Sequence, residues 1–212
     1  MFYDILDEKR LAILPLLKNF KDGYYLAGGT GLALQLGHRD SIDFDFFSQE
    51  NIDTEKLFSQ IAEVFNGRKI VKVQEEKNSL AVFIDEDIKL SFLSYKYKLI
   101  DDVADEENIR IASVPDIACM KLAAIVSRAA NKDYIDLYFI LKIFSLEDIL
   151  DKMNEKMPSL DINLVLKSLV YFKDISAEPI KFKNNNDASI EAVENFLVEK
   201  VSDLNKIGLR KL

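Results

Sequence analysis

Hydrophobic and polar residues follow different patterns in the two halves of this chain. In the first half, short segments alternate residue by residue, which is typical of half-buried strands, and they are separated by segments of helical spacing. The predicted strands cover residues 24–28, 41–48 and three consecutive segments within 69–97. The predicted helices cover residues 4–20, 30–37 and 53–65. The first half is therefore expected to hold a mixed sheet with helices.

The second half of the chain has helical spacing almost throughout. Residues 111–144 predict helix with a break near Ala130 and Asn131, and residues 145–212 predict further amphipathic helices around a loop at 179–187. An acidic loop links the two halves near residues 100–112. The fold class predicted is therefore α+β, with a mixed-sheet domain at residues 1–110 and an all-helical domain at 111–212.

Composition narrows the class of protein. The chain has 212 residues, of which 49% are hydrophobic, so it can bury a substantial core. Its single cysteine, Cys119, excludes an internal disulfide and a cysteine zinc cluster, and its apolar helical setting predicts a core position. A net charge of −8 argues against non-specific nucleic-acid binding. No apolar run reaches the ~18 residues that span a bilayer, so we expect a cytoplasmic protein without a membrane partner.

A glycine pair stands between the first predicted strand and the next helix, in the segment LAGGTG. A helix that begins at Gly28 and Gly29 can turn its backbone N–H groups toward an anion, because glycine lets a phosphate approach closely. Thr30 would add a hydroxyl donor or cap the helix. An ordinary turn with a capping residue explains the same letters.

Two aspartates follow one helix later, in the segment SIDFDFF. Alternation along a strand places Asp43 and Asp45 on one face and turns Phe44 and Phe46 toward a core. Two neighbouring carboxylates repel each other, and a hard cation such as Mg²⁺ relieves that repulsion. An exposed acidic strand end is the alternative.

A second polar block lies in the helical half, in the segment DIACMKLAAIVSRAANKDYIDL. If residues 116–142 formed one continuous helix, Lys121, Arg128, Lys132 and Asp136 would share one stripe, and a break near Asn131 would disturb it. Such a cationic stripe suits a triphosphate. A solvated helix face with pairs such as Lys132–Asp136 is the alternative.

Both blocks together resemble the AbiEii/AbiGii-type toxin nucleotidyltransferases of the polymerase-beta-like superfamily. The family pattern of the first block matches Gly28, Gly29, Thr30, His38, Arg39, Ser41, Asp43 and Asp45. The pattern of the second block matches Asp116, Lys121, Arg128, Lys132, Asp133 and Asp136. The resemblance spans residues 24–140 and does not extend to residues 145–212.

The resemblance implies an enzyme that moves a nucleoside monophosphate from an NTP to an acceptor hydroxyl. Asp43 and Asp45 would hold Mg²⁺ or Mn²⁺, and Asp136 would position Lys121 or a substrate. The nucleotide would contact Gly28, Gly29, Thr30, Arg39, Ser41, Lys121 and Arg128. The family further implies a type IV toxin that acts in abortive infection against phage, with tRNA as acceptor and a cognate antitoxin as partner.

One departure from the superfamily pattern bears on activity. Many relatives carry a third carboxylate on a neighbouring strand, where this chain is predicted to have Ser91. The acids at residues 85–87 are predicted to form a hairpin turn instead. Either one metal ion suffices, or the protein is a catalytically impaired nucleotide-binding module that acts through a partner. The lone His38 is expected to hold the loop that precedes the aspartates.

Overall fold

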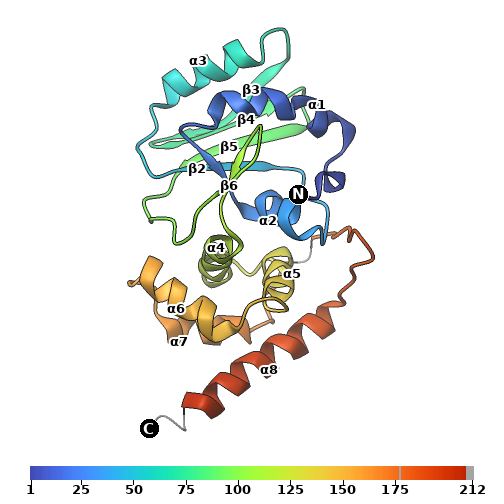
Figure 1. Cartoon of the computed structure of the whole chain (residues 1–212), viewed down its shortest axis with the longest axis vertical. Helices are drawn as coiled ribbons and strands as arrows, with labels where there is room; N and C mark the ends of the chain where they lie inside the picture. Colours follow the sequence, from blue (N-terminus) through green and yellow to red (C-terminus); the bar gives the residue numbers. More distant parts are fainter. Residues whose placement is uncertain (177, 209–212) are drawn as a thin grey trace.

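A computed structural model describes residues 1–176 and 178–208 of the chain. Its centre is a seven-stranded mixed sheet with the strand order β3-β4-β5-β2-β1-β7-β6 (Figure 1). The strands are β1 (Tyr25–Leu26), β2 (Phe44–Ser48), β3 (Ile70–Glu76), β4 (Ser79–Ile84), β5 (Ile88–Ser94), β6 (Ala104–Asp105) and β7 (Arg110–Ile111). β2 pairs with β5 in parallel and with β1 in antiparallel orientation, so β2 is a central strand.

Helices of the first half surround this sheet. The α-helices are α1 (Glu8–Leu17), α2 (Gly28–Leu36) and α3 (Thr54–Val64), and 3-10 turns η1 (Tyr3–Ile5) and η2 (Lys18–Phe20) flank α1. The predicted cap of α3 is confirmed, because the Asp53 carboxylate accepts a hydrogen bond from the Lys56 amide. Pro15 lies inside α1, which ends two residues later.

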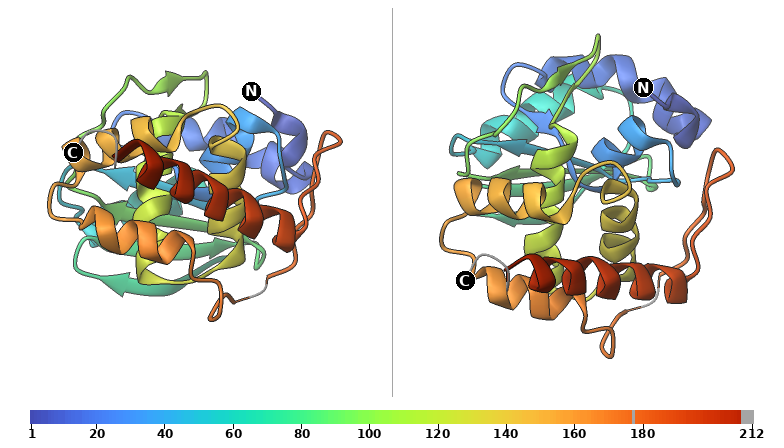
Figure 2. Two further views of the ribbon diagram at one scale, coloured as in Figure 1. Left: turned by 90° about the horizontal axis from the view of Figure 1, so that it is seen from below. Right: turned by 60° about the horizontal axis from the view of Figure 1, so that its bottom comes forward.

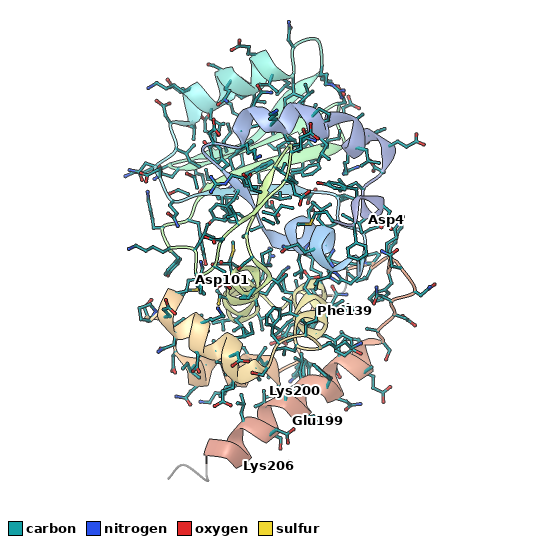
Figure 3. The ribbon with its side chains drawn as sticks, in the orientation of Figure 1. Asp4, Asp101, Phe139, Glu199, Lys200 and Lys206 are labelled. Carbon is teal, nitrogen blue, oxygen red and sulfur yellow. The ribbon has the colours of Figure 1, made fainter. Side chains whose placement is uncertain are left out.

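The second half is helical, as predicted. Its helices are α4 (Val114–Ser127), α5 (Asn131–Ile140), α6 (Leu146–Lys156), α7 (Ile162–Leu169) and α8 (Ile190–Gly208). α4 contacts α2 of the first half as well as α5, α6 and α7. α8 lies along the outer side of α5, α6 and α7 (Figure 2). Its charged residues Glu199, Lys200 and Lys206 lie along the end of the molecule farthest from the sheet (Figure 3).

Two hydrophobic cores lie on opposite faces of the sheet. One packs α1 and α3 against residues such as Phe44 and Phe46 of β2, which are both fully buried, as the alternation predicts. The other joins α4–α8 and includes Tyr25 of β1 and the buried Cys119 of α4. β2 alternates buried and half-buried residues, so the packed phenylalanines hold Asp45 between them in a fixed position on the less buried face.

Most predicted elements are present, although one strand begins later than predicted. β2 begins at Phe44, so Ser41 and Asp43 lie in the segment before the strand and not within it. The predicted break near Ala130 and Asn131 is confirmed, because α4 ends at Ser127 and α5 starts at Asn131, so residues 116–142 do not form one continuous helix. The last four residues of the predicted helical half lie outside the described residues. The division into two domains stays a prediction.

Among the described residues, no helix is both long enough and apolar enough to cross a membrane.

Candidate active site

A cavity of about 600 Å³ lies where the sheet meets the helical half. Its walls come from five parts of the chain that are distant in sequence: the start of α2, the segment around β2, β5, the α4–α5 region and the segment before α8. Polar lining residues are Gly28, Gly29, Arg39, Asp40, Ser41, Asp43, Asp45, Lys89, Lys121, Arg128, Lys132, Asp133, Glu178 and Lys181. The two sequence blocks therefore meet at one site.

The glycine pair forms the first turn of α2 and leaves no room for larger residues. Gly28 has a φ of +62°, and a Cβ on it would lie 3.0 Å from Oδ2 of Asp45. A Cβ on Gly29 would lie 2.7 Å from Nη2 of Arg39. The residue before the helix, Ala27, supplies no side-chain cap. Gly28 and Gly29 both line the cavity, so no Cβ at either position keeps a bound anion away from the backbone of this turn.

Gly28→Ala is expected to lower activity by displacing Asp45, and to lower the free energy of unfolding by about 1–2 kcal/mol through its positive φ. Gly23→Ala is the matched control, because a Cβ there meets nothing within 4 Å. Denaturant titrations and nucleotide transfer by the two variants provide the measurement. Equal transfer by both variants would contradict a close approach of Gly28 to Asp45.

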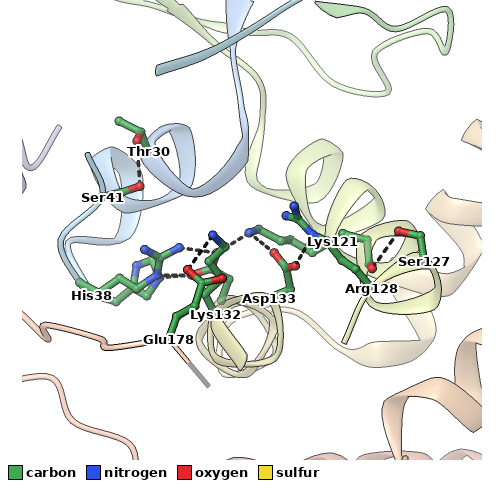
Figure 4. A network of polar contacts seen from close by, with 12 residues as sticks. Thr30, His38, Ser41, Lys121, Ser127, Arg128, Lys132, Asp133 and Glu178 are labelled. Carbon is green, nitrogen blue, oxygen red and sulfur yellow. Dashed lines mark hydrogen bonds and ion pairs between the residues drawn. The ribbon is translucent and has the colours of Figure 1, made fainter. Parts of the chain in front are cut away.

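Thr30 supports the site from beneath and does not line the cavity. It is buried, its Oγ1 donates a hydrogen bond to the Asp43 carbonyl oxygen, and the same atom lies 2.8 Å from Oγ of Ser41 (Figure 4). It therefore neither caps α2 nor faces the cavity. Its hydroxyl joins α2 to the segment that carries the first aspartate.

Asp43 and Asp45 both face the cavity, although only Asp45 belongs to β2. Burial raises the pKa of the Asp45 carboxyl; a hydrogen bond from Ser91 opposes this shift, and the charge of Asp43 adds to it. The charges of Lys89 and Lys121 also oppose the shift, but the effect of burial exceeds them, so the folded protein disfavours the ionised form of Asp45.

This pair fits a hard divalent cation. Among the described residues there is no cluster of three or more histidine, cysteine, aspartate or glutamate side chains able to hold a metal by itself. Two carboxylates are nevertheless the protein share that Mg²⁺ commonly takes, because it completes its shell with water and substrate phosphates.

A buried network of charges forms the opposite wall (Figure 4). Oδ2 of Asp136 lies 2.5 Å from Nζ of Lys121 and accepts a hydrogen bond of 2.8 Å from Nη2 of Arg39. Oδ1 of Asp136 accepts a 2.6 Å bond from Nε of Arg39 and lies 2.9 Å from Nε2 of His38. Lys121 also donates to Asp133 at 2.7 Å. Asp136 therefore joins both sequence blocks.

The charge states of this network follow from its geometry. Burial alone would raise the pKa of Asp136, but the charges of Lys121 and Arg39 overcome it and hold that pKa well below its usual range. Burial alone would lower the pKa of Lys121, and Asp136 and Asp133 raise it instead. Both groups are thus charged at neutral pH, and His38 serves the structural role expected of it.

The break between α4 and α5 separates the cations that one continuous helix would place in a single stripe. Arg128 follows the end of α4, is 61% exposed at its side chain and lies 3.1 Å from Asp133. Lys132 lies in the first turn of α5 and pairs at 3.0 Å with Glu178. The alternative of a Lys132–Asp136 surface pair is wrong, because Asp136 is fully buried. All four residues of the expected stripe still lie at or behind the cavity wall.

Several residues of the site have no signal in the sequence. Nε of the buried Arg10 donates a 2.6 Å hydrogen bond to the Ile42 carbonyl oxygen and so fixes the chain just before Asp43. Nη2 of Arg10 also donates to the Asp87 carbonyl oxygen at 2.7 Å, next to β5. Arg10 also pairs with Asp7, three residues before it, but no motif marks its role at the site, because the partners there are backbone atoms distant in sequence.

The segment before α8 crosses the cavity mouth. The Asp40 amide donates to the Lys181 carbonyl oxygen at 2.8 Å, and the Lys183 amide donates to the His38 carbonyl oxygen at 3.1 Å. The Glu178 amide donates to the Asn131 side chain at 3.1 Å. Residues 178–183 thus bridge the two blocks, a role that their sequence does not reveal.

Strand register places Ser91 beside the second aspartate. Asp45 of β2 pairs directly with Ser91 of β5. Ser91 is therefore the residue beside the aspartates, as the sequence predicts, and this strand carries no acid facing the cavity.

Comparison with solved structures identifies the class of fold. A computed superposition with a candidate nucleotidyltransferase of Helicobacter pylori gives a TM-score of 0.58 at 20% identity, covering 95% of this chain and 99% of that one. The nucleotidyltransferase toxin MenT4 of Mycobacterium tuberculosis gives 0.57 at 15% identity, covering 91% and 82%. At these identities the likeness concerns the fold, which is that of the nucleotidyltransferases.

Sequence comparison then gives the family. Residues 16–202 match the family of the nucleotidyl transferase AbiEii toxin of type IV toxin–antitoxin systems, and the chain belongs to this family. An uncharacterized protein of Aquifex aeolicus is 34% identical over 186 residues, which are 85% of this chain and 87% of that protein. The predicted family, fold and enzyme class are thus confirmed.

Proposed function

We propose that this nucleotidyltransferase uses Mg²⁺ held by Asp43 and Asp45 to transfer a nucleoside monophosphate from an NTP. One observation supports this most strongly: the glycine turn of α2, the two aspartates and the Lys121 network open into a single cavity. Each of these three features alone can be explained by the structural role of its residues. Their convergence on one cavity is not explained in this way, because the features come from segments that are distant in sequence.

In the proposed reaction the triphosphate lies between the α2 turn and the cation wall. The N–H groups of Gly28 and Gly29 and the side chain of Arg128 contact phosphate oxygens, and Lys121 is held toward them by Asp133 and Asp136. Mg²⁺, when bound, neutralises charge on the phosphates and orients them. Arg39 is committed to Asp136 through two hydrogen bonds, so we assign it a positioning role.

The bonds exchanged are those of phosphoryl transfer. An acceptor hydroxyl oxygen attacks the α-phosphorus and forms the new P–O bond. The bond from the α-phosphorus to the bridging oxygen breaks, and pyrophosphate leaves with its electron pair, while the hydroxyl proton passes to water. Positioning and charge neutralisation account for most of the catalysis in such reactions.

We further propose that the acceptor is the 3′ end of tRNA, and that the protein acts in the cytoplasm as a toxin countered by a cognate antitoxin in abortive infection against phage. The family supports the toxin role and the antitoxin partner. The net charge of −8 favours an acceptor that docks locally, because the chain as a whole repels nucleic acid. An antitoxin gene beside the gene for this protein would support the pairing.

The acceptor can be tested with tRNA whose terminal ribose has been opened by periodate. Intact tRNA is expected to gain label from an α-³²P-labelled NTP, and oxidised tRNA to gain at least about 100-fold less, since the attacking hydroxyl is gone. Mock-treated tRNA controls for handling. Equal labelling of oxidised tRNA, or label that appears only in protein, would contradict a 3′-terminal acceptor.

A second candidate function is favoured by one observation, the serine beside Asp45. In this alternative the protein is an impaired nucleotide-binding module that acts through a partner. Calorimetry with each NTP, with and without Mg²⁺, separates the two functions. Metal-dependent binding without turnover would support the module, and binding followed by pyrophosphate release would support the enzyme.

A further inference from the structure

Strand β5 places a lysine at the edge of the site, next to the position at which many superfamily relatives carry an acid. The register pairs Phe44 with Leu90 and Asp45 with Ser91. Lys89 precedes Leu90, so it projects from the same face of β5 as Ser91. Lys89 and both aspartates line the cavity. A half-buried cation therefore stands beside the two carboxylates.

Lys89 differs from most other cations of the cavity in having no fixed partner. Arg39, Lys121, Arg128 and Lys132 are each paired with a carboxylate. Among the described residues the ammonium of Lys89 forms no hydrogen bond or ion pair, and the carboxylate on which its charge acts is Asp45 of the site. A lysine that structure alone required would be expected to have such a partner, as the fully buried Lys156 does with Asp116.

The charge of Lys89 bears on how many metal ions the site can hold. Two Mg²⁺ ions at one site need more than two carboxylates, because each ion takes protein oxygens and repels the other. Here the position beside Asp45 has a hydroxyl, and the next residue on the same face has a positive charge. That charge opposes a second ion and can itself neutralise a phosphate.

We propose that Lys89 takes the place of a second metal ion: its ammonium contacts the reacting phosphate, and Asp43 and Asp45 hold one divalent ion. This proposal rests on the proposed nucleotidyl transfer. It gives Lys89 a catalytic role that neither the family motif nor the sequence pattern assigns to it. It also explains how the site can work with a serine, Ser91, at the position of the third carboxylate.

Counting bound ions tests the proposal without relying on activity. Equilibrium dialysis with Mn²⁺ and a non-hydrolysable α,β-methylene NTP analogue, read by electron paramagnetic resonance, gives the ions bound per chain. We expect one ion for the wild type and two for the double variant Lys89→Ala, Ser91→Asp, which restores a third carboxylate. Two ions in the wild type, or one in the double variant, would overturn the proposal.

Transfer of label provides the second readout. Lys89→Ala is expected to lose about 100-fold in rate, the scale reported for removing one donor to a developing charge, and Lys89→Arg to recover at least about tenfold of that loss. Lys72→Ala is the matched control, since Lys72 lies on β3 of the same sheet and outside the cavity lining. Wild-type transfer by Lys89→Ala would overturn the proposal.

The two failures are distinguishable. If the wild type transfers no label from any NTP, the proposed function fails and the catalytic role of Lys89 fails with it, while the ion count still shows whether the site holds one ion or two. If the wild type transfers label but binds two ions, only the role of Lys89 fails.

Discussion

Asp45→Asn is expected to abolish nucleotide transfer, with a loss of about 1000-fold or more, and to leave the fold intact. The carboxylate is the proposed metal ligand on β2, and an amide cannot neutralise a divalent ion. Asp43→Asn should lose transfer to a similar degree, because one carboxylate cannot replace two. Label transfer and thermal unfolding of the same preparations are the measurements.

The direction of the change in stability caused by Asp45→Asn can also be predicted. Burial and the charge of Asp43 raise the pKa of Asp45, so the folded state disfavours its ionised form. Above that raised pKa the charge costs folding free energy, and replacing it with a neutral amide should leave the metal-free protein as stable as the wild type, or more stable. Such a result is expected where a functional side chain lowers the stability of the folded protein.

Asp53→Asn is the matched control for the two aspartate variants. Asp53 is an exposed helix cap of α3 that does not line the cavity, and asparagine caps helices about as well as aspartate. It should change neither stability nor transfer. Asp45→Asn with more than a tenth of wild-type transfer would contradict the metal-ligand role.

Asp136→Asn is expected to lower the free energy of unfolding at pH 7 by about 3 kcal/mol or more. Removing one member of a buried charge network leaves its partners uncompensated, and here the partners are Lys121 and Arg39. Transfer should fall as well, since Lys121 and the segment after His38 lose their common anchor. Urea titrations of the variant and the wild type give the difference.

The pH dependence of that difference follows from the lowered pKa of Asp136. A carboxyl with a folded pKa below its unfolded value, about 3.9, adds stability above pH 3.9 and loses it as the pH falls through the folded pKa. The difference between wild type and Asp136→Asn should therefore persist from pH 7 to 5 and shrink below about pH 4. A difference that vanishes already at pH 6 would exclude this origin.

Asp203→Asn serves as the control for burial. Asp203 pairs with Lys206 on the exposed face of α8, and surface pairs of this kind contribute little. Its substitution should leave stability unchanged at every pH.

The sequence predicts the strands and helices well because their patterns are local. The alternation of SIDFDFF indicates the buried Phe44 and Phe46, and the polar residues that end each run indicate the turns. The start of β2 could not be predicted, since tertiary contacts from Thr30 and Arg10 hold the preceding segment in an extended form without strand pairing.

Only part of the site could be predicted from the sequence, because many of its contacts join residues that are distant in sequence. The residues of the motifs could be found because their spacing is fixed within each block. Their partners could not: Asp136 reaches His38 and Arg39 across nearly a hundred residues of sequence. The continuous-helix hypothesis failed at Arg128, where the chain leaves helical geometry with a φ of −151°. Lys89 has no motif, and only strand register shows its place.

The most direct test of the proposed nucleotidyl transfer follows the α-phosphate and the γ-phosphate of the NTP separately. Wild-type protein is incubated with Mg²⁺, total tRNA and each NTP labelled at either the α- or the γ-phosphate. We predict that α-label enters the acceptor, that γ-label appears only in released pyrophosphate, and that Asp45→Asn produces neither. Absence of α-label transfer from all four NTPs, in Mn²⁺ as well as Mg²⁺ and to protein as well as RNA, would contradict the account.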